Sequence, residues 1–389
     1  MDGGDAFPRC HRYDVRDPTA SIPPLGVSPP APVRTMFDGV LKVVVVDDSA
    51  LYRQMLLTVL GRIAGVEVVG TAVDGDAAVE LIARIRPDVV TLDVQMPGRD
   101  GIEVLRALKQ RGLSPRSIMV SSLTAQGAPT TVAALMEGAF DFVLKPVGGD
   151  LHVTRETIQR ELTEKLAAVR ESMGAPVVAA EKPPMERPFR PSATARFDAI
   201  VIGASTGGPQ ALRTVIPLLP ADLPVPVFVV QHIPAQFTGS LAERLDGMSR
   251  LRVVEAAEGM LVAPGMVLVA PGNRHLGVAH RGEQVVCVLD DGPRRRGCRP
   301  SVDHLLESAA RLYGGRVLGA VLTGMGCDGL DGCRDLKQRG GTVLAQSAAG
   351  CVVYGMPKAV SEAGLVDEVV PLEQMAPRLA AWLRGTAGE

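Results

Sequence analysis

The chain has 389 residues, of which 46% are hydrophobic and 22% are charged, and its formal net charge is -2. That length accommodates two domains, and the charge balance lacks the basic excess of a general nucleic-acid-binding protein. No apolar run approaches the length of a bilayer, and the first residues carry charges where a signal peptide needs an apolar core. We therefore expect a cytoplasmic protein with no nucleic-acid partner and no membrane insertion.

Two further features limit the interpretation before any motif is considered. The six cysteines have no paired C-x-x-C spacing, which favours free thiols over a zinc site or a disulfide framework. Residues 1–39 are rich in proline and show no sustained apolar period. We predict that this segment is a disordered N-terminal extension, and we assign it no function.

From Leu41 the pattern becomes that of an α/β domain. The run LKVVVVDD is typical of a strand covered on both faces, and Leu51, Met55, Val59 and Ile63 then repeat as the stripe of a helix. Strands and helices alternate through VEVVGTAV, DAAVELIARI, DVVTLD, IEVLRALKQ, SIMVSS, TTVAALMEGA and DFVLKP. Five strands interleaved with helices predict a parallel, doubly wound sheet, in which active residues gather at the carboxyl ends of the strands.

Polar residues stand at four of those strand ends: Asp47 and Asp48, Asp93, Ser121, and Lys145. Three clustered carboxylates repel one another unless a cation lies between them, and an all-oxygen site suits Mg²⁺. A carboxylate so placed can accept a phosphoryl group, while a lysine and a hydroxyl hold the phosphoryl oxygens. The alternative is that these are unrelated acids in turns.

The motifs VDDSA, LDVQMPGRDG, MVSS and KP, in this order, resemble a response-regulator receiver domain with a flavodoxin-like fold. We place this domain at residues 40–160. The resemblance implies Asp93 as phosphoacceptor, Asp47, Asp48 and Asp93 as Mg²⁺ ligands, Lys145 as phosphoryl partner and Ser121 as switch hydroxyl. It also implies a cis bond before Pro146. Arg99 replaces the usual apolar residue of the M-P-x-x-D-G turn, which affects loop packing more than chemistry.

Residues 161–195 connect this domain to the next one. A charged helix is predicted over 154–173, with Ile158, Leu162, Leu166 and Val169 as its apolar stripe. A proline-rich segment over 174–195 follows and reads as an interdomain linker. A separate output domain is therefore expected over residues 196–389.

The stretch AIVIGASTGGP, residues 199–209, predicts a strand, a tight turn and a helix, with Ser205 between glycines at the turn. Such a turn is typical of a nucleophile elbow. Strands and helices alternate again to the end of the chain, with two strand-like runs around residues 266–290. We predict a second α/β domain with a parallel sheet and an inserted β-hairpin.

Two residues are candidates to activate Ser205. His232 ends the strand VPVFVVQH and Asp328 follows the strand VLGAVLTG, so a parallel sheet would bring both to the edge that carries the serine. Each also has a plainer interpretation, since a histidine at a strand end is often structural and Asp328 could cap the next helix. His280, in the predicted hairpin, and His304, in a predicted helix, are less well placed rivals.

The order of Ser205, His232 and Asp328 along the chain limits which class of serine hydrolase this could be. G-A-S-T-G satisfies G-x-S-x-G, but an α/β-hydrolase runs serine, acid, histidine, whereas this chain runs Ser205, His232, Asp328. A dinucleotide site is disfavoured because Ser205 stands where the fingerprint needs glycine. Backbone amides after Ser205 and in the loop 324–326 are available to stabilise an oxyanion.

The motifs GASTGGP, QHIP, APGNRH, RPSVDHL, LTGMGCDG and YGMPKA together resemble the catalytic domain of the chemotaxis protein-glutamate methylesterases, the CheB family. The resemblance implies Ser205 as nucleophile, His232 as base and Asp328 as orienting acid, with Thr206 and Met325 near the oxyanion. It implies hydrolysis of glutamate methyl esters, with release of methanol, and deamidation of glutamines on the cytoplasmic helices of chemoreceptors. The esterase site needs no cofactor, and the phosphodonor is a histidine kinase of the CheA type.

On this resemblance the unphosphorylated receiver covers the Ser205 edge, and phosphorylation of Asp93 weakens that cover. Two other classes stay open at this point: a receiver-driven binding module without catalysis, and a general serine hydrolase for small esters. The basic run around Arg294, Arg295, Arg296 and Arg299 fits either a contact with acidic receptor helices or an ordinary solvated loop.

Overall fold

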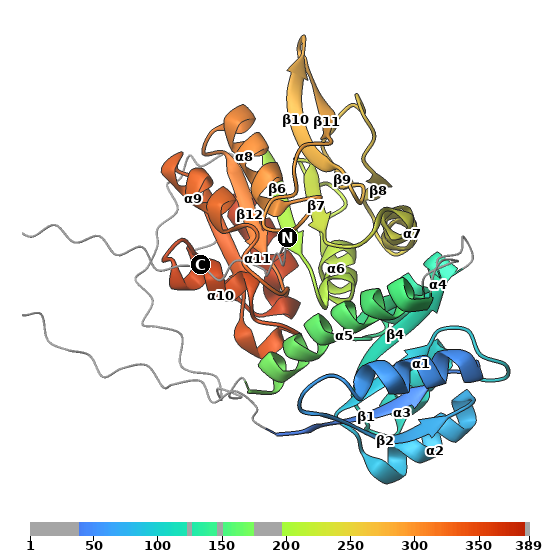
Figure 1. The fold of residues 1–389 in the computed structure, drawn as a ribbon. Coiled ribbons are helices and arrows are strands. Elements are labelled where there is room, and N and C mark those ends of the chain that lie inside the picture. Colours follow the sequence, from blue (N-terminus) through green and yellow to red (C-terminus); the bar gives the residue numbers. More distant parts are fainter. Residues whose placement is uncertain (1–38, 123–126, 146–150, 175–196, 386–389) are drawn as a thin grey trace, which may run out of the picture.

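The computed structural model describes residues 39–122, 127–145, 151–174 and 197–385. The predicted N-terminal extension, the bond before Pro146 and most of the proline-rich linker lie outside these ranges. The described residues form two parallel sheets, each covered by helices on both faces, as Figure 1 shows. The predicted α/β class is confirmed for both halves of the chain.

The first sheet has the strand order β2-β1-β3-β4-β5, and all of its pairings are parallel. Its helices alternate with the strands along the chain. The elements are β1 (Leu41–Val46), α1 (Ala50–Leu60), β2 (Val66–Ala72), α2 (Gly75–Ile85), β3 (Val89–Asp93), α3 (Gly101–Gln110), β4 (Arg116–Ser122), α4 (Gly127–Met136), β5 (Asp141–Lys145) and α5 (Leu151–Gly174).

Two sequence predictions about these helices differ in outcome. The stripe of Ile158, Leu162, Leu166 and Val169 is fully buried, as predicted, and lies on one continuous helix, α5. The domain boundary predicted at residue 160 falls within that helix. The stripe predicted for α1 is wrong at its first residue, because the Leu51 side chain is 64% exposed while Met55 and Val59 are buried.

The second sheet is also parallel and has the order β14-β13-β12-β6-β7-β9-β8. Its strands are β6 (Ala199–Ala204), β7 (Val227–Gln231), β8 (Arg252–Glu255), β9 (Met266–Val269), β12 (Val317–Val321), β13 (Thr342–Gln346) and β14 (Glu368–Val370). Its helices are α6 (Gly208–Val215), α7 (Ala235–Asp246), α8 (Val302–Tyr313), α9 (Leu330–Gln338), α10 (Met356–Glu362) and α11 (Leu372–Arg384), with short 3₁₀ turns η1 (Ile216–Leu218) and η2 (Ala348–Gly350).

The inserted hairpin is present but shorter than predicted. It consists of β10 (His275–Arg281) and β11 (Gln284–Asp290), which pair antiparallel and project from the second sheet in Figure 1. The earlier run, β9, instead pairs parallel with β7 and β8. The prediction assigned both runs to the hairpin because a strand's partner is not encoded in its own apolar pattern.

The two halves share an apolar contact. The Phe142 ring of β5 meets the Phe237 ring of α7 edge-on, with ring centroids 5.0 Å apart. Around this pair, α4 packs against α6 and α7, and one buried apolar cluster continues from the first half into the second. Within the described ranges, no helix is both long and apolar enough to cross a membrane.

Candidate active site and phosphoacceptor site

The second sheet brings the three predicted catalytic residues to one edge. Strand β6 lies between β7 and β12, so the strand order changes direction at β6. Ligand sites of open α/β sheets form at the carboxyl ends of the strands beside such a switch point. Ser205 follows β6, His232 follows β7, and Asp328 lies in the loop after β12.

The turn that carries Ser205 is held by hydrogen bonds to the backbone groups of the serine. The Ser205 N–H donates to the Thr323 carbonyl at 3.0 Å, and the Ser205 carbonyl accepts from Gln231 Nε2 at 2.9 Å and from the Gly208 N–H at 2.7 Å. Gly207 has φ +78°, which disfavours any residue with a Cβ. A Cβ at Gly208 would lie 1.9 Å from Gln231 Oε1, so the tight turn requires glycine there.

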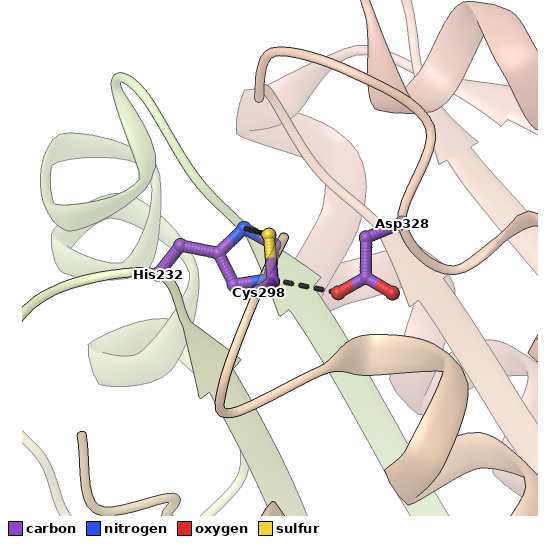
Figure 2. A group of neighbouring side chains, drawn as sticks. All are labelled: His232, Cys298 and Asp328. Carbon is purple, nitrogen blue, oxygen red and sulfur yellow. Dashed lines mark hydrogen bonds and ion pairs between the residues drawn. The ribbon is translucent and has the colours of Figure 1, made fainter. Parts of the chain in front are cut away.

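His232 and Asp328 form a close pair. His232 Nε2 lies 2.8 Å from Asp328 Oδ2, and Figure 2 shows the His232 ring joined by dashed lines to the aspartate and to Cys298. Asp328 is buried and accepts further hydrogen bonds from the Ser301 hydroxyl and from the N–H groups of Val302, Asp303 and Gly329.

The alternative that Asp328 caps the helix that follows it is wrong, although Asp328 does contact the start of a different helix. Helix α9, which follows it, has Gly329 at its N-cap and no side-chain cap, whereas Asp328 accepts from the first N–H groups of α8. The positive end of a helix favours a carboxylate. One residue thus anchors α8 and orients the histidine.

These contacts set the charges of the pair. Burial raises the pKa of Asp328, but the His232 contact and the α8 backbone outweigh burial and hold that pKa at about 2. Burial lowers the pKa of His232, but the neighbouring Cys298 and Asp328 outweigh burial and raise that pKa to about 10. These surroundings favour the imidazolium form of His232 and the carboxylate form of Asp328.

Ser205 is beside this pair but is not joined to it. Among the described residues, none hydrogen-bonds to the Ser205 hydroxyl. Because Asp328 takes His232 Nε2, the nitrogen left to accept a proton from the serine is Nδ1. Cys298 Sγ lies 3.6 Å from that Nδ1.

All three residues line a cavity of about 390 Å³ that the two halves of the chain enclose together. One wall carries Ser205, His232 and Asp328. The opposite wall belongs to the first half and includes Asp141 and Phe142 of β5, with Glu161, Glu164 and Lys165 of α5.

The two residues expected near an oxyanion also lie in this cavity. Thr206 follows the serine, and its hydroxyl donates to Asp141 Oδ2 across the two halves at 2.9 Å. Met325 lies in the loop after β12, and its side chain is 41% exposed. In that loop, a Cβ at Gly324 would lie 2.8 Å from Ser205 Cβ, so glycine allows the loop to approach the serine.

In the first half, Lys145 contacts two of the strand-end carboxylates. Lys145 Nζ lies 2.6 Å from Asp93 Oδ2 and 2.8 Å from Asp47 Oδ2, and the lysine also lies over the Tyr52 ring. Ser121 Oγ is 2.6 Å from Thr131 Oγ1. Burial raises the pKa of Asp93 to about 6; Lys145 opposes that rise and Asp47 adds to it.

Asp47, Asp48 and Asp93 each offer a carboxylate oxygen, and these oxygens lie within 4.8 Å of one another. The donor set is all oxygen, and a divalent cation would relieve the repulsion between the buried carboxylates of Asp47 and Asp93, with Asp48 exposed beside them. These residues therefore fit Mg²⁺. Arg99 pairs with Asp76, in the first turn of helix α2, at 2.8 Å, which agrees with a role in loop packing.

Three residues of the catalytic edge did not enter the sequence prediction. Gln231 and Thr323 hold the Ser205 turn, and Cys298 contacts the histidine. Gln231 could have been found, because it precedes His232 at the same strand end. No sequence signal marks Cys298, since its loop reaches the site only through folding.

The chain matches two family models, "Response regulator receiver domain" over residues 43–155 and "CheB methylesterase" over residues 200–379. It is 42% identical over 345 residues to the "Protein-glutamate methylesterase/protein-glutamine glutaminase" of Thermotoga maritima, covering 88% of this chain and 99% of that protein. It is 44% identical over 348 residues to "Protein-glutamate methylesterase/protein-glutamine glutaminase 5" of Myxococcus xanthus, covering 88% and 98%.

A solved structure, the Thermotoga maritima CheB methylesterase catalytic domain, is 45% identical and covers 48% of this chain and 98% of that chain, with a TM-score of 0.47. The fold, the two polar edges and the family models define a response regulator with an enzymatic output domain. The chain belongs to the family of protein-glutamate methylesterases/protein-glutamine glutaminases.

Proposed function

We propose that this chain hydrolyses glutamate methyl esters, and deamidates glutamines, on the cytoplasmic helices of chemoreceptors. Ser205 attacks the acyl carbon, His232 Nδ1 takes the serine proton, and Asp328 orients the imidazole. Methanol or ammonia leaves with a proton returned by His232, and water then releases the glutamate. The observation that carries the proposal is the convergence of serine, histidine and aspartate on one cavity.

Stabilisation of the oxyanion falls to backbone amides of the Ser205 turn and of the glycine-rich loop that carries Met325. Each preorganised donor in such sites contributes about 3 kcal/mol to transition-state binding. Thr206 is committed to Asp141 in this structure, so the turn and the regulatory half of the molecule are directly linked.

Control of the site is assigned to Asp93. We propose that Asp93 accepts a phosphoryl group from a histidine kinase of the CheA type, with Mg²⁺ held by Asp47, Asp48 and Asp93, and with Lys145 and Ser121 as its partners. Mg²⁺ would neutralise charge on the transferring phosphoryl group. The wall formed by β5 and α5 supports the view that the unphosphorylated receiver restricts access to Ser205.

The test is methanol release from methylated receptors by the full chain, with and without a small-molecule phosphodonor. We expect Ser205→Ala to abolish release, and Asp93→Asn to keep the basal rate but lose its response to the phosphodonor. Thr214→Ala, a hydroxyl on α6 that bonds only within its helix, is the matched control. Release that persists in Ser205→Ala would contradict the nucleophile assignment, and a preserved response in Asp93→Asn would contradict the control.

A further inference from the structure

The Cys298 thiol contacts Nδ1 of the His232 imidazole, the nitrogen that Asp328 does not use. Asp328 contacts Nε2 and Cys298 Sγ lies 3.6 Å from Nδ1, so aspartate, histidine and thiol form one chain of contacts (Figure 2). An orienting carboxylate, an imidazole and a sulfur in this sequence are the parts of an activated cysteine. The proposed esterase chemistry uses the first two parts and leaves the thiol without a role.

The loop that carries Cys298 is firmly held. The backbones of Arg295 and Cys298 exchange two hydrogen bonds, of 3.0 and 2.8 Å, across a tight turn. Arg295 is anchored to Glu307 of α8 at 2.7 and 2.5 Å. Arg296 pairs with Asp303 and with Asp331. The position of the thiol beside the imidazole is therefore built by several independent contacts.

A metal ion is a weaker interpretation of the same group. His232, Cys298 and Asp328 offer ligand atoms within 4.8 Å of one another. However, the Asp328 oxygens already accept from Ser301 and from three backbone N–H groups. The histidine faces the thiol with Nδ1 and the carboxylate with Nε2. A metal ion placed at either nitrogen would therefore have only two of these protein ligands, whereas zinc sites use three or four.

We propose that Cys298 is a second nucleophile of this cavity and a site of S-thiolation by low-molecular-weight disulfides. The cavity of about 390 Å³ lies within the range of small-molecule sites, and Cys298 is one of its lining residues. Cys298 is a free cysteine of intermediate exposure, whereas Cys287 and Cys333 are buried.

The step is a thiol–disulfide exchange. The Cys298 thiol gives up its proton to solvent beside the His232 imidazolium, which stabilises the negative charge, and the Cys298 sulfur attacks one sulfur of the disulfide. A bond forms between these two sulfurs as the original disulfide bond breaks, and the second sulfur leaves as a thiolate that takes up a proton from solvent. No other oxidant is needed, and a second thiol reverses the reaction.

The consequence for hydrolysis rests on the proposed function. Ser205 and Cys298 both depend on His232 Nδ1, so an adduct on the cysteine places its bulk where the serine must transfer its proton. We expect S-thiolation to stop methanol release and a reducing thiol to restore it. The covalent step itself does not depend on the esterase assignment.

The test treats the full chain with oxidised glutathione and follows the intact mass, the modified peptide and methanol release. We expect one glutathionyl group on Cys298 in the wild type and none at this position in Cys298→Ser. Cys351→Ser is the matched control, because burial raises the pKa of Cys351 to about 12 and makes that thiol inert. Its adduct should equal that of the wild type.

His232→Gln tests the role of the imidazole. We expect it to slow modification of Cys298 by about tenfold, the gain expected from an imidazole-paired thiol. An adduct on Cys327 in place of Cys298, no adduct, or an unchanged rate in His232→Gln would overturn the proposal. If an adduct forms on Cys298 in a chain that releases no methanol, the esterase assignment fails and the thiol assignment stands.

Discussion

The surroundings of His232 favour its protonated form, and this bears directly on its proposed role as a base. Burial opposes the proton, while Cys298 and Asp328 favour it and raise the pKa to about 10. A protonated imidazole cannot accept the Ser205 proton. Glu161, Glu164 and Lys165 of α5 line the same cavity, so movement of the receiver would also change the charges that the histidine meets.

We predict that methanol release by the full chain rises with pH up to about 10, the pKa of His232 in this structure. In Cys298→Ala the contact that favours the imidazolium is lost, so the midpoint of the profile should move to lower pH. The measurement is the initial rate against pH for both proteins, without a phosphodonor. Superimposable profiles would show that the thiol does not influence the base.

The raised pKa of His232 also makes the stability of the fold depend on pH. A pKa raised above its unfolded value means that the folded state binds the proton more tightly. The stabilisation by His232 is thus fully present below its unfolded pKa, near 6.5, and is lost as pH rises towards about 10.

At the scale of elements, Ser301 makes two different contacts where the loop after β12 meets the start of α8. Ser301 caps α8 through the His304 N–H and also donates to Asp328 Oδ1 at 2.8 Å. It is fully buried. The same hydroxyl therefore stabilises a helix and fixes the carboxylate that contacts the His232 imidazole.

We predict that Ser301→Ala lowers the free energy of unfolding by about 1–2 kcal/mol, because a cap is lost and a buried carboxylate loses a donor. The pH midpoint of methanol release should shift as well, which a purely structural cap would not cause. Chemical denaturation and the pH profile measure the two effects. Ser361→Ala is the control, since that hydroxyl bonds only to a carbonyl within α10; an equal loss of stability there would remove the special role of Ser301.

The elements were predicted correctly from the sequence where apolar periodicity alone determines them. The buried stripe of α5 and the strand ends at His232 and Asp93 follow from apolar periodicity. The hairpin was extended wrongly over β9 because pairing depends on distant strands, and Leu51 was placed in the core because periodicity alone does not show where a neighbouring element ends. Cys298 reaches the imidazole through a loop fixed by α8, and such tertiary contacts leave no local signal.

At the scale of the whole molecule, the two halves meet through several polar contacts around the Phe142–Phe237 pair. Arg213 of α6 donates to the Met136 carbonyl at 2.9 Å and lies 3.6 Å from Glu137. Arg244 of α7 donates to the Pro129 carbonyl at 3.1 Å. These contacts hold α4 against the catalytic half.

We predict that Arg213→Ala raises methanol release in the absence of a phosphodonor by about fivefold, the population change that corresponds to roughly 1 kcal/mol. Its two contacts stabilise only the arrangement in which the receiver lines the cavity. Arg252→Ala, at an exposed position on the edge strand β8, is the control and should leave the rate unchanged. A basal rate that does not increase in Arg213→Ala would mean that this contact does not restrain the enzyme.

Strand β5 is only five residues long, yet it begins with Asp141 and Phe142, which touch the catalytic half, and ends with Lys145, which contacts Asp93. The proposed phosphoacceptor and the contact with the catalytic half are therefore reached from opposite ends of one short strand. Receivers are often regarded as interchangeable modules, but a foreign receiver fused here would carry its phosphoacceptor without the matching first residues of this strand. A substitution at Asp141 therefore alters the contact with the Ser205 turn and the strand that carries Lys145 at the same time.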